Sequence, residues 1–167
     1  MAEAFNDRTL IGSKAERYAE VAREIAAVLE GEPNLVARMA TVVSMLAATF
    51  EHYFWTGFYV VDPERPGELV VGPYQGTLGC LRIPFGRGVC GTAAQTRTTQ
   101  LVPDVHAFAG HIACDPASRS ELVVPLVTPQ GLRGVLDLDS PRPGRFDAHD
   151  ERGISELASI YLRASRF

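Results

Sequence analysis

Residues 120–139 read SELVVPLVTPQGLRGVLDLD, and their pattern indicates the central part of the fold. Residues 120–128 and 132–139 are both rich in apolar side chains, and the short turn PQG joins them. Two such runs around a turn of this kind are typical of a β-hairpin. The pattern therefore predicts two antiparallel strands in the second half of the chain.

Three carboxylic acids fall on one face of this predicted hairpin. Successive side chains of a strand point to opposite faces, so Asp137 and Asp139 share a face. If the hairpin is centred on Gln130, Glu121 lies opposite Asp139 and Val123 lies opposite Asp137. Like charges directly opposite each other are unfavourable, unless a cation or an ammonium group lies among them or one carboxyl carries a proton. The alternative is a solvated strand face that ends in aspartates.

An aromatic segment earlier in the chain predicts a second hairpin. Residues 55–62 (WTGFYVVD) are rich in aromatic and β-branched types, and the turn PERPG separates them from a strand near residues 68–72. Trp55, Gly57 and Tyr59 would share a face, and a strand glycine often marks the close approach of a ligand or of another backbone. A gap between the two rings could hold a thioether methyl group. The alternative is a pair of core aromatic residues and a bulge.

Helices are predicted on both sides of these strands. Apolar residues recur at helix spacing over residues 14–30, and again after Asn34, which is suited to cap a second helix. Residues 87–97 can form a short helix, and a closing helix follows Asp147. This order predicts an α+β fold in which helices pack on a largely antiparallel sheet.

The composition is that of one globular domain. The chain has 167 residues, of which 46% are hydrophobic and 22% are charged, so we expect a single domain over residues 1–167. The net charge is −4 and no basic stripe is present, which argues against a nucleic-acid partner. No apolar run approaches the roughly 18 residues of a membrane helix. No signal-peptide pattern is visible, so we expect no membrane association and a cytoplasmic location.

Three cysteines are an odd, small number that does not suggest a secreted disulfide framework. Inert core thiols, a metal site and redox chemistry all remain open. Cys114 lies within residues 103–119, a predicted long loop, and is the better candidate for a nucleophile. Cys90 lies at a predicted helix start, where the helix dipole favours a thiolate, and Cys80 on a glycine-flanked loop suits a mobile resolving thiol.

The metal alternative would combine His106, His111 and Cys114. Their H-x4-H-x2-C spacing matches no established ligand pattern. The sequence GRG at residues 86–88 is not a phosphate-binding loop, and no flavin or nucleotide motif is present. We therefore expect no metal and no other cofactor.

Four stretches carry a resemblance to a known family. They are YFWTGFYVV (53–61), GPYQGTLGCLRIPFGRGVCGTAA (72–94), LVPDVHAFAGHIACDPASRSELVVPL (101–126) and GVLDLDSPRPGRFDAHD (134–150). Together they resemble the free methionine-(R)-sulfoxide reductases, single-domain proteins of the GAF fold, over a core of about residues 14–163. The resemblance implies a six-stranded antiparallel sheet flanked by helices, and a homodimer. It also implies reduction of the R epimer of free methionine sulfoxide, with thioredoxin as the reductant.

The resemblance further implies roles for the three cysteines. Cys114, in GHIACD, would be the attacking thiolate and would become a sulfenic acid. Cys80 would resolve it as an intramolecular disulfide, with Cys90 as a second resolving or relay thiol.

Substrate contacts are also implied by the resemblance. The three acids already named would lie around the substrate: two would bind its ammonium group, and one protonated carboxyl would donate to the sulfoxide oxygen. Trp55 and Tyr59 would hold the methyl and sulfur end, and backbone amides of residues 112–115 would receive the carboxylate. Two alternatives of other classes stay open. One is a GAF-type sensor that binds a small ligand without chemistry, and the other is a redox-responsive dimer cross-linked by its cysteines.

Overall fold

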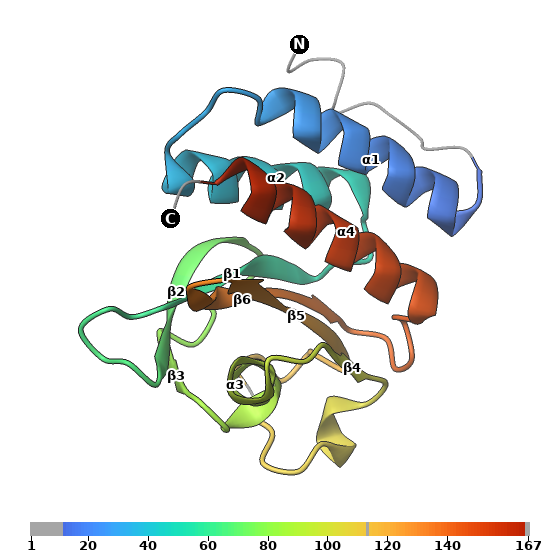
Figure 1. Ribbon diagram of the computed structural model, residues 1–167. Helices are drawn as coiled ribbons and strands as arrows, with labels where there is room; N and C mark the ends of the chain where they lie inside the picture. The colour runs from blue at the N-terminus through green and yellow to red at the C-terminus, as the bar shows by residue number, and fades with distance from the viewer. Residues whose placement is uncertain (1–11, 113, 166–167) are drawn as a thin grey trace.

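A computed structural model describes residues 12–112 and 114–165, and these form a six-stranded antiparallel sheet with helices on both faces (Figure 1). The predicted α+β class and the strand number are therefore confirmed. The strands are β1 (Trp55–Val61), β2 (Glu68–Gln75), β3 (Arg82–Pro84), β4 (Gln100–Val102), β5 (Ser120–Thr128) and β6 (Gly131–Ser140). The helices are α1 (Lys14–Val28), α2 (Leu35–Thr49), α3 (Gly88–Thr96) and α4 (Ala148–Ala164), with a 3-10 turn at Val105–Ala107. The strand order is β3-β2-β1-β6-β5-β4.

The sheet separates two apolar cores. Helices α1, α2 and α4 cover one face, and α3 with its neighbouring loops covers the other (Figure 1). Phe58, Leu136 and Leu138 point to the three-helix face, where they are fully buried. Val123 and Val135 point to the α3 face and belong to the second core. The alternation of strand side chains thus divides the molecule into a helical layer and the layer that holds the candidate site.

The hairpin of β5 and β6 has the register that the sequence predicts. Glu121 pairs with Asp139, and Val123 pairs with Asp137. On its other side β6 pairs with β1, which places Trp55 opposite Asp139. Two central strand pairs therefore bring an aromatic side chain and three acids to one end of the α3 face.

Helix starts follow their capping residues. The Asn34 side chain accepts a hydrogen bond from the amide of Ala37 at 3.0 Å and begins α2. Asp147 accepts from the amide of His149 at 2.7 Å and begins α4. Both caps agree with the predicted boundaries. No described helix combines the length and the apolar character that a membrane span requires.

Three features of the sheet differ from the prediction. Strands β3 and β4 have only three residues each, too few for an alternating pattern to be recognised. Strand β2 runs to Gln75, beyond the predicted end near residue 72. It continues through Pro73 because β3 pairs only with residues 68–70, so the missing amide hydrogen of the proline breaks no bond of that ladder.

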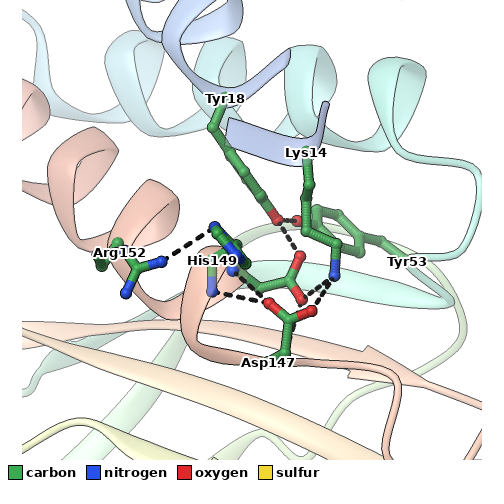
Figure 2. Close-up of polar contacts among 7 residues, drawn as sticks. Lys14, Tyr18, Tyr53, Asp147, His149 and Arg152 are labelled. Atoms are coloured by element: carbon green, nitrogen blue, oxygen red, sulfur yellow. Dashed lines mark hydrogen bonds and ion pairs between the residues drawn. The ribbon is translucent and has the colours of Figure 1, made fainter. Parts of the chain in front are cut away.

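A polar cluster fastens α1 to the start of α4 on the three-helix face (Figure 2). Lys14 forms ion pairs with Asp147 at 2.8 Å and with Asp150 at 2.6 Å. The hydroxyl of Tyr18 donates to Asp150 at 2.8 Å and is also hydrogen-bonded to the hydroxyl of Tyr53. The cluster lies across the sheet from α3, so its contribution is to the packing of the helical layer.

Candidate active site

A pocket opens on the α3 face of the sheet, between the end of the central strands, the start of α3 and two loops that carry cysteines. It encloses about 540 Å³ of empty space, its open mouth included. The polar and sulfur-bearing residues that line it are Arg87, Cys90, His111, Cys114, Asp115, Ser118, Glu121, Asp137 and Asp139. Its apolar wall is made chiefly by Phe54, Trp55, Tyr59, Leu78, Ile83, Val89 and Ile112.

The three acids of the hairpin converge in this pocket. Glu121 and Asp137 are buried, with 6% and 5% of their surface exposed, and Asp139 is half-buried beside them. One carboxylate oxygen of Asp137, Oδ1, has no hydrogen-bond partner among the described residues. A solvated strand face, the alternative for this pattern, is therefore wrong. The arrangement is instead a largely buried cluster that lines the pocket and contains an unsatisfied polar atom.

Burial shifts the titration of all three acids. The pKa values of Glu121 and Asp137 lie well above their usual range, first because burial disfavours the charged form and then because neighbouring carboxylates repel it. Burial also raises the pKa of Asp139, to about 6, although the Ser118 hydroxyl, which donates to its Oδ1, opposes the shift. The pocket can therefore hold protonated carboxyls as hydrogen-bond donors near neutral pH, next to a carboxylate that is charged.

Two of the cysteines are joined at the mouth of the pocket. Cys80 and Cys114 form a disulfide with 5.3 Å between their Cα atoms, across 34 residues of sequence. Cys114 is exposed and Cys80 is half-buried. The structure thus brings together the two thiols that the sequence interprets as a nucleophile and its resolving partner.

Cys90 is free and buried on the first turn of α3. Its thiol donates to Glu121 Oε1, with 3.8 Å between sulfur and oxygen. Burial and the nearby charges of Asp137 and Glu121 raise the pKa of this thiol well above its usual range. The expectation that the helix start favours a Cys90 thiolate is therefore wrong, because desolvation beside acids outweighs the helix dipole.

The aromatic residues of β1 form a stack without a gap. Trp55 stacks on Tyr59, with 5.6 Å between ring centroids, and on Tyr74 of β2, with 5.2 Å. A side chain at Gly57 would collide with the indole, since an added Cβ would lie 2.6 Å from it, so the glycine makes room for Trp55 itself. A methyl group cannot lie between Trp55 and Tyr59 as the sequence suggested. Both rings nevertheless line the pocket, and the β1–β2 register shifts between Gly57 and Tyr59, as a bulge requires.

Two hydrogen bonds tie the Cys80 loop to its surroundings. The indole nitrogen of Trp55 donates to the carbonyl of Thr77 at 3.1 Å. The Thr77 hydroxyl donates to Asp115, the residue after Cys114, at 2.7 Å. This donation and a second one from the amide of Ala117 hold the pKa of the Asp115 carboxyl below its usual range.

Sequence reasoning missed four residues of the site. Arg87, Asp115 and Ser118 line the pocket, and Thr77 fixes one of its loops. Asp115 and Ser118 follow Cys114 within four residues, so the motif CDPAS contained a signal that a loop prediction did not use. The Ser118–Asp139 contact joins residues 21 positions apart and follows from the tertiary fold alone.

The metal alternative of the sequence does not assemble. The rings of His106 and His111 are 6.4 Å apart at an angle of 84°, and Cys114 is held in the disulfide. Within the described parts of the chain, the one group with ligand atoms close enough for a metal is Cys90, Glu121 and Asp137, all within 4.8 Å. Burial raises the pKa values of all three groups, so a metal ion would have to displace protons to bind them.

The predicted carboxylate site in residues 112–115 is only partly described, because Ala113 lies outside the described residues. The amide of Cys114 donates to the carbonyl of Ile112 at 3.0 Å and is therefore already paired. The next side chain, Asp115, carries a negative charge that opposes an anion at this position.

Comparison with known protein families matches residues 15–161 to the GAF domain. GAF domain-containing protein A of Dictyostelium discoideum is 46% identical over 149 residues, which cover 89% of this chain and 92% of that protein. Free methionine-R-sulfoxide reductase of Escherichia coli is 44% identical over 147 residues, with 88% and 87% covered. The X-ray structure of free methionine-R-sulfoxide reductase from Neisseria meningitidis in complex with its substrate superposes with a TM-score of 0.89 at 44% identity, covering 94% of this chain and 93% of that one.

Proposed function

Since this chain belongs to the GAF-domain family and, within it, to the free methionine-R-sulfoxide reductases, we propose that it reduces the R epimer of free methionine sulfoxide to methionine. The observation that carries the proposal is the Cys80–Cys114 disulfide beside a pocket that is lined by three acids, two of them buried. Sulfoxide reduction needs a soft nucleophile at sulfur, an acid at oxygen and a second thiol. This pocket supplies all three.

In the proposed reaction the Cys114 thiolate attacks the sulfoxide sulfur. A protonated carboxyl of Glu121 or Asp137 donates to the sulfoxide oxygen, which is transferred to Cys114 as the sulfenic acid while methionine is released. The Cys80 thiol then attacks the sulfenic acid, so that water leaves and the disulfide forms. Two electrons from a dithiol, for which we propose thioredoxin, return both cysteines to thiols.

The remaining acid and the aromatic wall position the substrate. Asp139, whose pKa is about 6, is charged at pH 7 and suited to bind the ammonium group. Trp55 and Tyr59 present a continuous apolar surface for the methyl and sulfur end. Cys90 is retained as a second candidate for a resolving or relay thiol, although burial raises its pKa and so lowers the fraction of thiolate available for attack.

The decisive experiment couples the chain to thioredoxin, thioredoxin reductase and NADPH, with the two epimers of free methionine sulfoxide supplied separately. We expect NADPH consumption with the R epimer only, and none with Cys114→Ser. Consumption of neither epimer would contradict the proposal and favour a GAF-type sensor, which binds a ligand without turnover. Size-exclusion chromatography with light scattering tests the proposed homodimer, and a reduced chain that stays dimeric would exclude cross-linking by the cysteines.

Cys80→Ser and Cys90→Ser separate the resolving roles. If Cys80 resolves, Cys80→Ser accumulates a Cys114 sulfenic acid that dimedone traps, whereas Cys90→Ser forms the disulfide at the rate of the unmodified chain. The opposite pattern would assign the resolving role to Cys90.

A further inference from the structure

The charges that line the pocket are unbalanced. Four carboxyl groups line it, those of Asp115, Glu121, Asp137 and Asp139, but Arg87 is the single Lys or Arg side chain among the described lining residues. A free amino acid carries a carboxylate as well as an ammonium group. At pH 7 the charged carboxylates of Asp115 and Asp139 repel its carboxylate, whereas the guanidinium of Arg87 attracts it.

His111, the other basic side chain of the lining, does not supply a second positive charge. Burial lowers the pKa of its imidazole, and the nearby His106 lowers it further, so the ring is neutral at pH 7. A neutral ring offers a hydrogen bond but no counter-charge. Among the described lining residues, Arg87 is therefore the side chain with a positive charge that can balance a substrate carboxylate.

Arg87 occupies the N-cap position of α3, and its side chain makes no capping hydrogen bond there. The amide of Gly88 donates to the carbonyl of Gly110 at 3.1 Å. The next amides, those of Val89 and Cys90, belong to the first turn, whose N–H groups have no acceptor within the helix. Both residues are buried and line the pocket. A guanidinium and uncapped first-turn amides at a helix N-terminus form an anion-binding arrangement.

The first turn of α3 lies directly beside the acids. The Cys90 thiol, on the same first turn, is 3.8 Å from Glu121 Oε1. Asp137, which also lines the pocket, is 5% exposed and has one carboxyl oxygen, Oδ1, without a hydrogen-bond partner among the described residues, and a buried polar atom of this kind is usually satisfied by a partner such as a ligand. In a free amino acid the ammonium and the carboxylate are attached to one carbon atom. A site for such a molecule needs opposite charges at adjacent positions, as the hairpin acids and the start of α3 provide.

We infer that Arg87 is a specificity-determining residue, which binds the α-carboxylate of the substrate together with the first-turn amides of α3. The inference rests on the proposed function and deepens it, because it explains how a free amino acid is distinguished from one whose carboxyl group is in a peptide bond. The inference also gives a different carboxylate site from the one that the resemblance implied, the amides of residues 112–115. There the Cys114 amide already donates to a backbone carbonyl, and the negative charge of Asp115 would repel a carboxylate.

The test compares two substrates, methionine-(R)-sulfoxide and its carboxamide, which lacks the negative charge. For Arg87→Gln we expect kcat/KM for the free acid to fall about tenfold to a hundredfold, the range of a lost charge-assisted hydrogen bond. The loss should lie mainly in KM, since the carboxylate is remote from the reacting sulfur. The carboxamide should be reduced equally well by both proteins, and Arg87→Lys should recover part of the preference for the acid.

Arg97→Gln is the matched control, because it removes the same charge from the other end of α3, where Arg97 is the exposed C-cap residue and lies outside the pocket lining. Arg97→Gln should leave the ratio of kcat/KM for the free acid to kcat/KM for the carboxamide unchanged. Equal losses on both substrates for Arg87→Gln, or no loss on either, would overturn the inference. If the unmodified chain reduces neither substrate, the proposed function itself fails, and binding of methionine and of methioninamide by calorimetry still tests the carboxylate site.

Discussion

The Thr77 hydroxyl donates a hydrogen bond to the carboxylate of Asp115 over 2.7 Å, and this contact joins the loop of Cys80 to the loop of Cys114. The disulfide joins the same two loops. The two links stabilise each other. Once one of them has formed, the loops lose less conformational entropy when the other forms. If the Thr77–Asp115 contact persists after reduction, it should keep the two thiols near each other.

Thr77→Val should therefore make the disulfide easier to reduce. A net contribution of one hydrogen bond corresponds to about a twofold to tenfold fall in the equilibrium constant for disulfide formation. The measurement equilibrates the chain with mixtures of reduced and oxidised dithiothreitol and counts the free thiols. Thr77→Ser keeps the donor and should restore the constant. Thr96→Val removes a hydroxyl that is bonded within α3, so it should not change the equilibrium constant for disulfide formation. If Thr77→Val has the same constant as the unmodified chain, other contacts hold the two loops together.

Ser118→Ala should move the acid limb of the pH profile. The Ser118 hydroxyl donates to Asp139 and stabilises its charged form, which limits the rise of the Asp139 pKa to about 6. Without this donor the pKa rises further, so a higher pH is needed to obtain the carboxylate that binds the substrate ammonium group. We expect kcat/KM to fall several-fold at pH 6.5 and to approach the value of the unmodified chain at pH 8.5.

The control for this experiment is Ser120→Ala. Ser120 is buried two residues away and donates to the carbonyl of Arg142 at 2.7 Å, away from the acids. Its loss should lower the stability of the fold without moving the acid limb. An acid limb that stays in place for Ser118→Ala would show that another group titrates there.

The sequence predicted the acid cluster because its geometry is local. Alternation along β6 and a turn centred on Gln130 suffice to place Glu121 opposite Asp139. The titration of Cys90 could not be predicted in this way. It depends on acids that are distant in sequence and reach the thiol only after α3 has packed on the sheet. The helix dipole was the local signal, and a non-local contact reversed its effect.

The aromatic gap failed for a related reason. The alternation of strand side chains places Trp55, Gly57 and Tyr59 on one face, as observed. It does not predict the side-chain rotamers, which decide where the rings lie on that face. The indole crosses the glycine and fills the space that the pattern left open. The place of Arg87 in the site could not be predicted from the sequence. It depends on the other charged residues of the pocket, which are brought together only by the fold.

Tyr18→Phe should destabilise the chain without affecting the site. The Tyr18 hydroxyl bonds to Asp150 and Tyr53 in the cluster between α1 and α4 (Figure 2). Its removal leaves polar groups in a buried position with fewer partners, which costs about 1–3 kcal/mol of the free energy of unfolding. For a chain of this length we expect Tm to fall by several degrees, at about 2–4 °C per kcal/mol. kcat/KM at 25 °C should stay the same, because the sheet separates this cluster from the pocket; a large loss of activity in folded protein would contradict this separation.

Asp137→Asn should stabilise the fold while it removes activity, and the gain should depend on pH. The folded state raises the pKa of Asp137 well above its usual range, because the carboxyl is buried and lies near Asp139. The folded protein therefore holds a proton that the unfolded chain, with an ordinary aspartate pKa of about 3.9, has released. The free energy of unfolding consequently falls as the pH rises above about 4 toward the folded-state pKa.

Asparagine has no charge to desolvate, so this loss with rising pH disappears in Asp137→Asn. We expect the variant to melt a few degrees above the unmodified chain at pH 8, for a gain of about 1 kcal/mol, and close to it at pH 4.5, where the carboxyl is already protonated. Thermal unfolding at both pH values, with the disulfide intact in both proteins, measures the difference. A variant that melts below the unmodified chain at pH 8 would show that Asp137 stabilises the fold. The expected result would instead identify it as a group whose burial serves the substrate at the expense of stability.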